Sequence, residues 1–252
     1  MLSLNQIKLI NSLSVKKYRR EHGLFVVEGE KMVEELLRQS RLQVSMVFGI
    51  KGWLDNHQHV LQQLPGKWQE VTESELKKIS TLTTPNQVLA TVELPASAPE
   101  YSLAADALCF YLDGLQDPGN LGAILRIADW FGMPAVFCSP DCVDVYNPKV
   151  VQASMGAICR VQSWEVNLSD LMENQTGLTI SGAVLNGSNV FEAELPSKGL
   201  LVIGNEGKGI SPNIERLLTQ RLTIPKHPDG GAESLNAAVA AGILAAFCFG
   251  SR

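Results

Sequence analysis

Three loops of this 252-residue chain combine glycine with polar side chains of the kinds that bind ligands and orient reacting groups. Each loop follows a short apolar run that is predicted to be a buried strand. The loops are residues 113–122, 204–209 and 225–236, with the sequences DGLQDPGNLG, GNEGKG and PKHPDGGAESLN. In open α/β sheets ligands bind beyond the carboxyl ends of the strands, so the three loops together predict a binding site. Any one of them alone is also explained as turn chemistry, with glycine chosen for positive φ.

A cation, Arg126, interrupts the apolar face of the helix that is predicted directly after the first loop. Apolar residues recur at helical spacing through NLGAILRIADWFG, residues 120–132. The guanidinium has no carboxylate four residues to either side, and its first i, i+3 partner is Asp129. A surface arginine whose side chain reaches past an apolar stripe explains this placement, and so does a functional cation. The helix alone leaves both interpretations open.

Several common chemistries lack their motifs. The chain has no GxGxxG after a strand, no GxxxxGK[ST] and no GxSxG, which disfavours Rossmann dehydrogenases, P-loop enzymes and α/β-hydrolases. Its five cysteines form an odd count with a single C-x₃-C pair, so we expect reduced thiols and no metal site. The N-terminus lacks the long apolar core of a signal peptide, and the apolar stretch 237–250 is too short to cross a bilayer. We therefore expect a cytoplasmic protein with no membrane partner.

Charge is unevenly distributed along the chain, although the formal net charge is −5. Residues 1–95 hold 12 Lys and Arg against 10 Asp and Glu, whereas residues 96–252 hold 9 against 16. Within the first part, a tight basic cluster surrounds Tyr18, formed by Lys16, Lys17, Arg19 and Arg20. Such a cluster is either a solvated helix face or a surface that binds phosphates.

Apolar patterning predicts two α/β units. In residues 1–94 we expect helices at 3–15 and 30–38, and strands at 24–27, 44–48, 68–71 and 88–94. Residues 95–106 break both periods and are predicted to be a linker. In residues 107–252 we expect a mostly parallel sheet with strands at 108–112, 135–138, 179–184, 200–203 and 221–224.

The three loops and their flanks resemble the three successive motifs of the SpoU, or TrmH-like, ribose methyltransferases of the SPOUT superfamily. The matching stretches are LDGLQDPGNLGAILRIADWFG, LVIGNEGKGIS and IPKHPDGGAESLNAAVAAGILA, with NPKVVQASMGAI between the first two. YRREHGLFVVEGEKMVEELL resembles the small RNA-binding domain of many members, similar to a ribosomal-protein fold, so the resemblance covers nearly the whole chain. Two features depart from the family pattern: a slightly longer third loop at 225–234, and Gln152 where arginine is common.

The resemblance implies an S-adenosyl-L-methionine-dependent enzyme that methylates a ribose 2′-hydroxyl in RNA. It favours ribosomal RNA, because the extra N-terminal domain is common in members that act there. It also implies an RNA-binding domain at 1–94, a catalytic domain with a trefoil knot at 107–252, and a homodimer formed through the catalytic domain. By match to the motifs, the expected cofactor contacts are Ile203, Gly204, Asn205, Ile224 and Leu235. The expected catalytic residues are Asn120, Arg126, Glu206, Ser234 and Asn236, and the expected RNA contacts are Lys16, Lys17, Arg19 and Arg20.

The implied reaction is an in-line attack of a ribose oxygen on a sulfonium methyl group, which requires an oriented hydroxyl and removal of its proton. Arginine is always protonated in proteins, so we expect Arg126 to bind the adjacent phosphate and the developing alkoxide rather than act as a literal base. Glu206 is expected either to brace the loops or to pair with Arg126, and Ser234 is also placed to cap the last helix. The alternatives are a transfer RNA enzyme, a SPOUT relative that methylates a base nitrogen, and a non-catalytic RNA-binding protein of the same fold.

Overall fold

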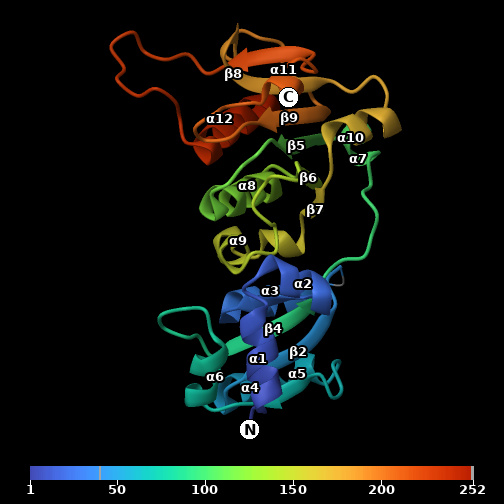
Figure 1. Cartoon of the computed structure of the whole chain (residues 1–252), viewed down its shortest axis with the longest axis vertical. Coiled ribbons are helices and arrows are strands. Elements are labelled where there is room, and N and C mark those ends of the chain that lie inside the picture. Colours follow the sequence, from blue (N-terminus) through green and yellow to red (C-terminus); the bar gives the residue numbers. More distant parts are fainter. Residues whose placement is uncertain (40, 251–252) are drawn as a thin grey trace. The chain divides into compact units, whose positions relative to one another are not determined.

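The computed structural model describes residues 1–39 and 41–250, and the chain divides into two compact units, most of whose elements are labelled in Figure 1. The first unit comprises Met1–Ser97 and Asp144–Cys159. The second comprises Ala98–Val143 and the chain from Arg160 onward. Among the described residues, no helix combines the length and the apolar character needed to span a membrane.

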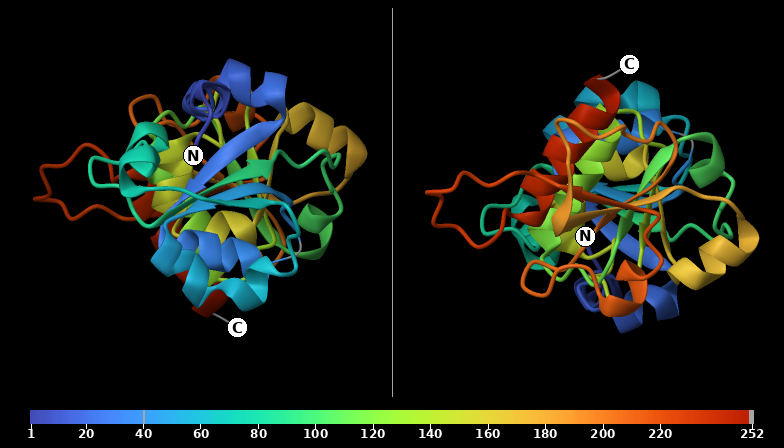
Figure 2. Two further views of the ribbon diagram at one scale, coloured as in Figure 1. Left: turned by 90° about the horizontal axis from the view of Figure 1, so that it is seen from below. Right: turned by 90° about the horizontal axis from the view of Figure 1, so that it is seen from above.

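The first unit is built on a four-stranded sheet of order β1-β4-β2-β3, in which only the β2–β3 pair is parallel. Helices lie on both faces of this sheet (Figure 2, left). Its strands are β1 (Leu24–Glu28), β2 (Val44–Gly49), β3 (Trp68–Glu70) and β4 (Val88–Glu93). Its helices are α1 (Leu4–Ser12), α2 (Lys16–His22), α3 (Glu30–Arg38), α4 (Lys51–Asn56), α5 (Gln58–Leu61) and α6 (Glu73–Ile79).

The segment Asp144–Cys159 packs in the first unit although in sequence it lies between the two parts of the second unit. It contains α9 (Pro148–Ser154), which lies against β1, and the 3₁₀ helix η1 (Ala157–Cys159). The ring of Tyr146 packs on Phe25 with centroids 4.7 Å apart, and Asp144 accepts a hydrogen bond from Arg19 Nε at 2.9 Å. The sequence prediction placed all of 107–252 in one domain, because these contacts join residues far apart in the chain and leave no local pattern.

The second unit is a six-stranded sheet of order β10-β8-β9-β5-β6-β7, with every pair parallel. This confirms the expected α/β class. The strands are β5 (Leu108–Leu112), β6 (Ala135–Cys138), β7 (Gln162–Glu165), β8 (Ile180–Asn189), β9 (Gly199–Ile203) and β10 (Gln220–Thr223). The helices are α7 (Leu103–Asp106), α8 (Pro118–Trp130), α10 (Leu168–Asn174), α11 (Pro212–Glu215) and α12 (Ala237–Gly250). The edge strand β7 was not predicted, because only Trp164 within it is buried and it has no apolar run.

The strand order explains which loops can meet. β5 lies between β9 and β6, and all five of its residues are buried, as expected for a central parallel strand. The first motif loop follows β5 and the second follows its neighbour β9, so the two loops emerge side by side at the carboxyl edge. The third loop follows β10 at the edge of the sheet and leads into α12, which packs on α8.

Candidate active site

Glu206 in the second loop holds the first loop in place. Its carboxylate accepts hydrogen bonds from Asn120 Nδ2 at 3.0 Å and from the backbone N–H groups of Asp117 at 3.2 Å and Gln116 at 3.5 Å. Burial raises the pKa of Glu206, but these donors outweigh burial, and its pKa lies below the ordinary value for glutamate. The carboxylate is therefore ionised at neutral pH. Of its two expected roles it braces the loops, and within the described chain it forms no ion pair with Arg126.

Asn120 connects the first loop to the third as well. Its Oδ1 accepts a hydrogen bond from Asn236 Nδ2 at 2.8 Å. Asn236 Oδ1 in turn accepts from the backbone N–H groups of Ala238 at 2.9 Å and Val239 at 3.2 Å, which makes Asn236 the N-cap of α12. The structure thus brings together one predicted catalytic residue from each loop, which we call the Glu206–Asn120–Asn236 network.

Ser234 is not part of this network. The prediction that it caps the last helix is wrong, because α12 begins at Ala237 and Asn236 occupies the capping position. Ser234 instead lies in an exposed loop, residues 225–236, that extends away from the rest of the second unit (Figures 1 and 2, orange-red). Hydrogen bonds within this loop include one from the Gly230 N–H to the His227 carbonyl at 2.9 Å.

The second loop folds tightly back on itself. A Cβ at Gly204 would lie 2.2 Å from the carbonyl carbon of Gly209, so only glycine permits this approach. The side chain of Asn205 is engaged within the loops: Nδ2 donates to the Gly114 carbonyl at 2.7 Å, and Oδ1 accepts from Gly207 and Lys208. Asn205, expected as a cofactor contact, therefore shapes the loops in this structure.

The other expected cofactor contacts occupy distinct positions. Ile203 is buried at the end of β9, and Ile224 is half-buried directly after β10. Leu235 is 46% exposed and directly precedes Asn236, which is bonded to Asn120. An apolar side chain open to solvent beside the amide side chain of Asn236 suits a ligand with an apolar ring and polar edges, as adenosine has.

Arg126 lies in α8 with its side chain exposed to solvent. Its guanidinium makes no hydrogen bond or ion pair within residues 1–39 and 41–250. Trp130, one helical turn further, is 83% exposed and shares this face of α8. Asn120 is about 120° away around the helix axis, so the free arginine and the Glu206–Asn120–Asn236 network lie on different faces of α8.

The basic cluster in α2 separates into two kinds of side chain. Lys17 and Arg20 are exposed, and Lys17 Nζ lies 5.8 Å from the centroid of the Tyr18 ring. Arg19 is only 2% exposed, and it donates from Nη1 to the Leu13 carbonyl at 2.7 Å and from Nε to Asp144. The expected RNA contact at Arg19 is wrong for this structure, because its guanidinium is enclosed by protein acceptors.

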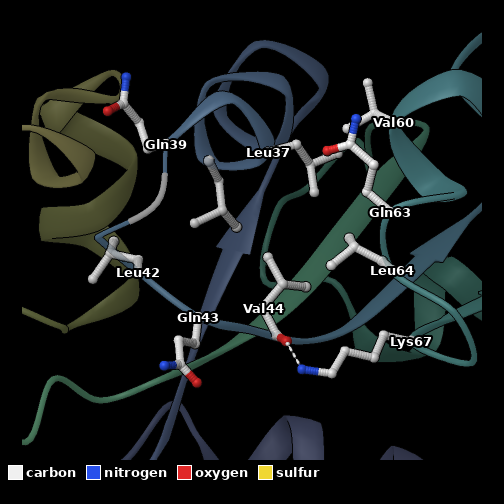
Figure 3. A pocket seen from close by; sticks show the side chains of 10 residues that line it. Leu37, Gln39, Leu42, Gln43, Val44, Val60, Gln63, Leu64 and Lys67 are labelled. Carbon is white, nitrogen blue, oxygen red and sulfur yellow. Dashed lines mark hydrogen bonds between the residues drawn. The ribbon is translucent and has the colours of Figure 1, made fainter.

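A hollow of about 290 Å³ opens in the first unit between the end of α3, the start of β2 and the residues after α5 (Figure 3). Leu42 and Leu64 form part of its wall, and Lys67 Nζ crosses it to donate to the Val44 carbonyl at 3.1 Å. Its lining contains none of the site residues predicted from the sequence. It is at the small end of the range for ligand pockets.

A parallel α/β sheet whose polar, glycine-rich loops converge at the strand ends defines a ligand-binding domain, and sequence comparison specifies its class. The chain belongs to the SpoU rRNA methylase family, which it matches over residues 107–246. Residues 5–90 match the MRM3-like substrate binding domain. These matches confirm the family and the class of enzyme expected from the motifs.

Relatives of similar length support this assignment. The 23S rRNA (guanosine(2553)-2'-O)-methyltransferase RlmP of Bacillus subtilis is 28% identical, with 95% of this chain and 94% of that protein aligned. A solved structure from Porphyromonas gingivalis, described as an RNA methyltransferase of the TrmH family, is 41% identical with a TM-score of 0.87 over the whole of both chains. An AdoMet-bound rRNA methyltransferase from Sinorhizobium meliloti is 26% identical with a TM-score of 0.85, covering 98% of this chain and 96% of that one.

Proposed function

We propose that the protein transfers a methyl group from S-adenosylmethionine to a ribose 2′-hydroxyl in ribosomal RNA. The observation that carries this proposal is the Glu206–Asn120–Asn236 network, in which one polar residue from each motif loop meets the others at 3.0 and 2.8 Å. The relatives supply the substrate class: the Bacillus subtilis protein is named for 2′-O-methylation of 23S rRNA and aligns over almost its whole length.

The residues divide into a cofactor-binding set and a substrate-orienting set. S-adenosylmethionine supplies a methyl group on a sulfonium, and Gly204, Ile224 and Leu235 are proposed to hold it. Asn120 and Asn236 each offer a donor and an acceptor, and so orient the loops and the ribose. These roles rest on match to the family motifs and on the positions of the side chains.

Arg126 is proposed to act electrostatically on the ribose oxygen. Its guanidinium carries a permanent charge and has no protein partner among the described residues, so it is available to an RNA phosphate and to the developing alkoxide. The proton of the hydroxyl then leaves to the phosphate or to water. Ser234, also expected to be catalytic, is exposed two residues before Asn236 and is proposed to contact the RNA substrate there.

The first unit is proposed to bind the RNA, with Lys16, Lys17 and Arg20 as phosphate contacts. We propose the organisation expected from the sequence, with an RNA-binding domain over 1–94, a linker over 95–106 and a catalytic domain over 107–252. Segment 144–159 then belongs in sequence to the catalytic domain and in packing to the first unit.

We also propose a cytoplasmic location, which fits an enzyme that acts on ribosomal RNA.

A homodimer through α8 and α12 is proposed for the catalytic unit. Trp130 is 83% exposed, Val239 50% and Phe247 37%, and a hollow of about 550 Å³ beside α12 is lined by Phe191 and Phe247. Apolar side chains this exposed on one pair of helices favour an interface. A partner that covers Trp130 would place Arg126 at the edge of that interface.

We also propose that the catalytic domain contains the trefoil knot expected from the sequence, because the chain belongs to the SpoU rRNA methylase family.

The decisive experiment maps 2′-O-methyl positions in RNA from cells with and without the gene. We expect one ribosomal RNA ribose to lose its methyl group, and the purified protein to restore it with S-adenosylmethionine. A missing methyl group in transfer RNA, or on a base nitrogen, would assign one of the alternative functions. An unchanged map and no transfer in vitro would indicate an RNA-binding protein.

The homodimer has its own test. Light scattering that shows a 27.4 kDa monomer at micromolar concentration would contradict the homodimer.

A further inference from the structure

A turn after β6, residues 139–143, is bonded directly to the first motif loop. Ser139 Oγ accepts the Gly114 N–H at 2.8 Å and donates to Asp141 Oδ1 at 2.5 Å. Cys142 Sγ accepts the Leu115 N–H at 3.2 Å and donates to the Leu112 carbonyl at 3.3 Å. The Val143 N–H completes the contact by donating to the Leu115 carbonyl at 2.8 Å. We call residues 139–143 the β6 turn.

The β6 turn and the second loop hold the same short piece of backbone between them. The Gly114 N–H is bound by Ser139, whereas its carbonyl is bound by Asn205 at 2.7 Å. Gly114 has φ +65°, which favours glycine, and a Cβ there would lie 3.0 Å from Asp141 Oδ2, a tight contact with the side chain of the turn. Two residues on, the Gln116 N–H is bound by Glu206.

Ser139 and Cys142 are almost fully buried, so little water can reach the hydrogen-bond acceptors that they supply. They are 6% and 8% exposed, and they supply the acceptors for two buried N–H groups at the point where β5 gives way to the motif loop. A buried N–H without an acceptor is unfavourable, so removal of either acceptor should shift the loop toward water. A hydrogen bond from the Cys138 thiol is the main cause that lowers the pKa of Cys142, in keeping with a sulfur that accepts hydrogen bonds.

We propose that Ser139 and Cys142 are positioning residues for methyl transfer. They bind the backbone N–H groups of Gly114 and Leu115, and the position of this backbone sets where Asp117 caps α8 and where Asn120 meets Glu206. This inference rests on the proposed function. Misplacement of a reacting group by about 1 Å from a distant substitution can slow a reaction by about a hundredfold, so a small shift of this loop has a measurable effect.

The test uses the full chain and single-turnover methyl transfer at saturating RNA and cofactor. Cys142→Val keeps the approximate volume and removes the acceptor, whereas Cys142→Ser replaces the thiol with a hydroxyl that also accepts and donates. We expect Cys142→Val and Ser139→Ala to slow transfer about tenfold or more with unchanged RNA affinity, and Cys142→Ser to recover most of the rate. The matched control is Cys109→Val, a buried thiol in β5 whose Sγ faces the Ala107 carbonyl at 3.9 Å, and it should keep the wild-type rate.

Hydrogen exchange at the amides of Gly114 and Leu115 gives a second readout that does not need activity. We expect faster exchange of Leu115 in Cys142→Val and of Gly114 in Ser139→Ala, with no change in Cys109→Val. Equal rates and equal exchange in Cys142→Val and Cys109→Val would overturn the proposal, and so would a Cys142→Ser variant as slow as Cys142→Val. Wild-type protein that methylates no RNA would refute the proposed function, whereas the exchange data would still report on the loop.

Discussion

Helices α2 and α8 each carry an arginine that the sequence marks as functional, and the structure gives the two opposite surroundings. Arg19 in α2 is 2% exposed and bonded to Asp144 and the Leu13 carbonyl. Arg126 in α8 is exposed and has no partner for its guanidinium among the described residues. One cation is part of the packing of the first unit, and the other remains available to an RNA phosphate.

This difference shows what a charge pattern in a sequence can establish. The cluster at 16–20 and the arginine in an apolar stripe both indicate an unusual placement of positive charge. They do not indicate whether an acceptor elsewhere in the chain has already taken up that charge. Asp144 lies 125 positions from Arg19, and only the fold brings the two together.

The largest stability effect that sharpens this comparison is expected at Arg19. Arg19→Ala leaves the partly buried Asp144 carboxylate without its partner and should lower the free energy of unfolding by about 3 to 5 kcal/mol. Lys17→Ala on the same helix is the matched control, and its change should be a few tenths of a kcal/mol. Urea unfolding of the full chain measures both. Equal, small changes in the unfolding free energy of the two variants would show that Arg19 contributes no more to stability than an exposed cation of α2. The contrast between Arg19 and Arg126 would then be wrong.

An intermediate effect is expected at Glu206, which is a partly buried charged residue with three hydrogen-bond donors around its carboxylate. Glu206→Gln replaces an ionised acceptor of three donors and should lower the free energy of unfolding by about 1 kcal/mol at pH 7, because solvent screens a partly buried carboxylate. The folded-state pKa is lowered, so this stabilisation is present above the unfolded value of about 4.3 and disappears as the pH falls through the folded value. Unfolding curves at pH 7 and pH 3 measure the difference, and a difference that does not depend on pH would contradict the bracing role.

The smallest effect is expected at the exposed cations of α2. Lys17→Ala should weaken RNA binding a few-fold and reduce the slope of log K against log salt by about one, as for the loss of one phosphate contact. RNA binding measured at several salt concentrations gives this slope. Glu21→Ala, an exposed acidic neighbour in the same helix, is the control and should not weaken binding. An unchanged slope in Lys17→Ala would assign the basic cluster to a solvated helix face.

Local patterns predicted much of the fold. The boundaries of β5, β6 and α3 agree with the predicted residues, because continuous apolar runs and helical spacing are local properties. β7 was missed because an edge strand with one buried residue carries little pattern. β8 extends to Asn189, five residues beyond its predicted end, into a stretch of polar and glycine residues.

The candidate site was predictable in part for the same reason. Its motif residues could be named from the sequence, and adjacent strands explain why the first two loops meet. The capping role of Asn236, the bonds of Asn205 and the β6 turn depend on contacts across the fold. A weak signal for the turn was present in CSPDC, residues 138–142, where a serine and a second cysteine follow the buried strand that ends at Cys138.

The central claim is that Arg126 stabilises the reacting ribose oxygen. Single-turnover methyl transfer with saturating S-adenosylmethionine and RNA tests it most directly, because saturation removes binding from the comparison. Arg126→Ala should slow transfer by about a hundredfold or more while cofactor affinity and fold remain, and Arg126→Lys should restore little, because an ammonium lacks the planar fork of the guanidinium. A wild-type rate in Arg126→Ala would contradict the account and leave Arg126 as an ordinary surface arginine.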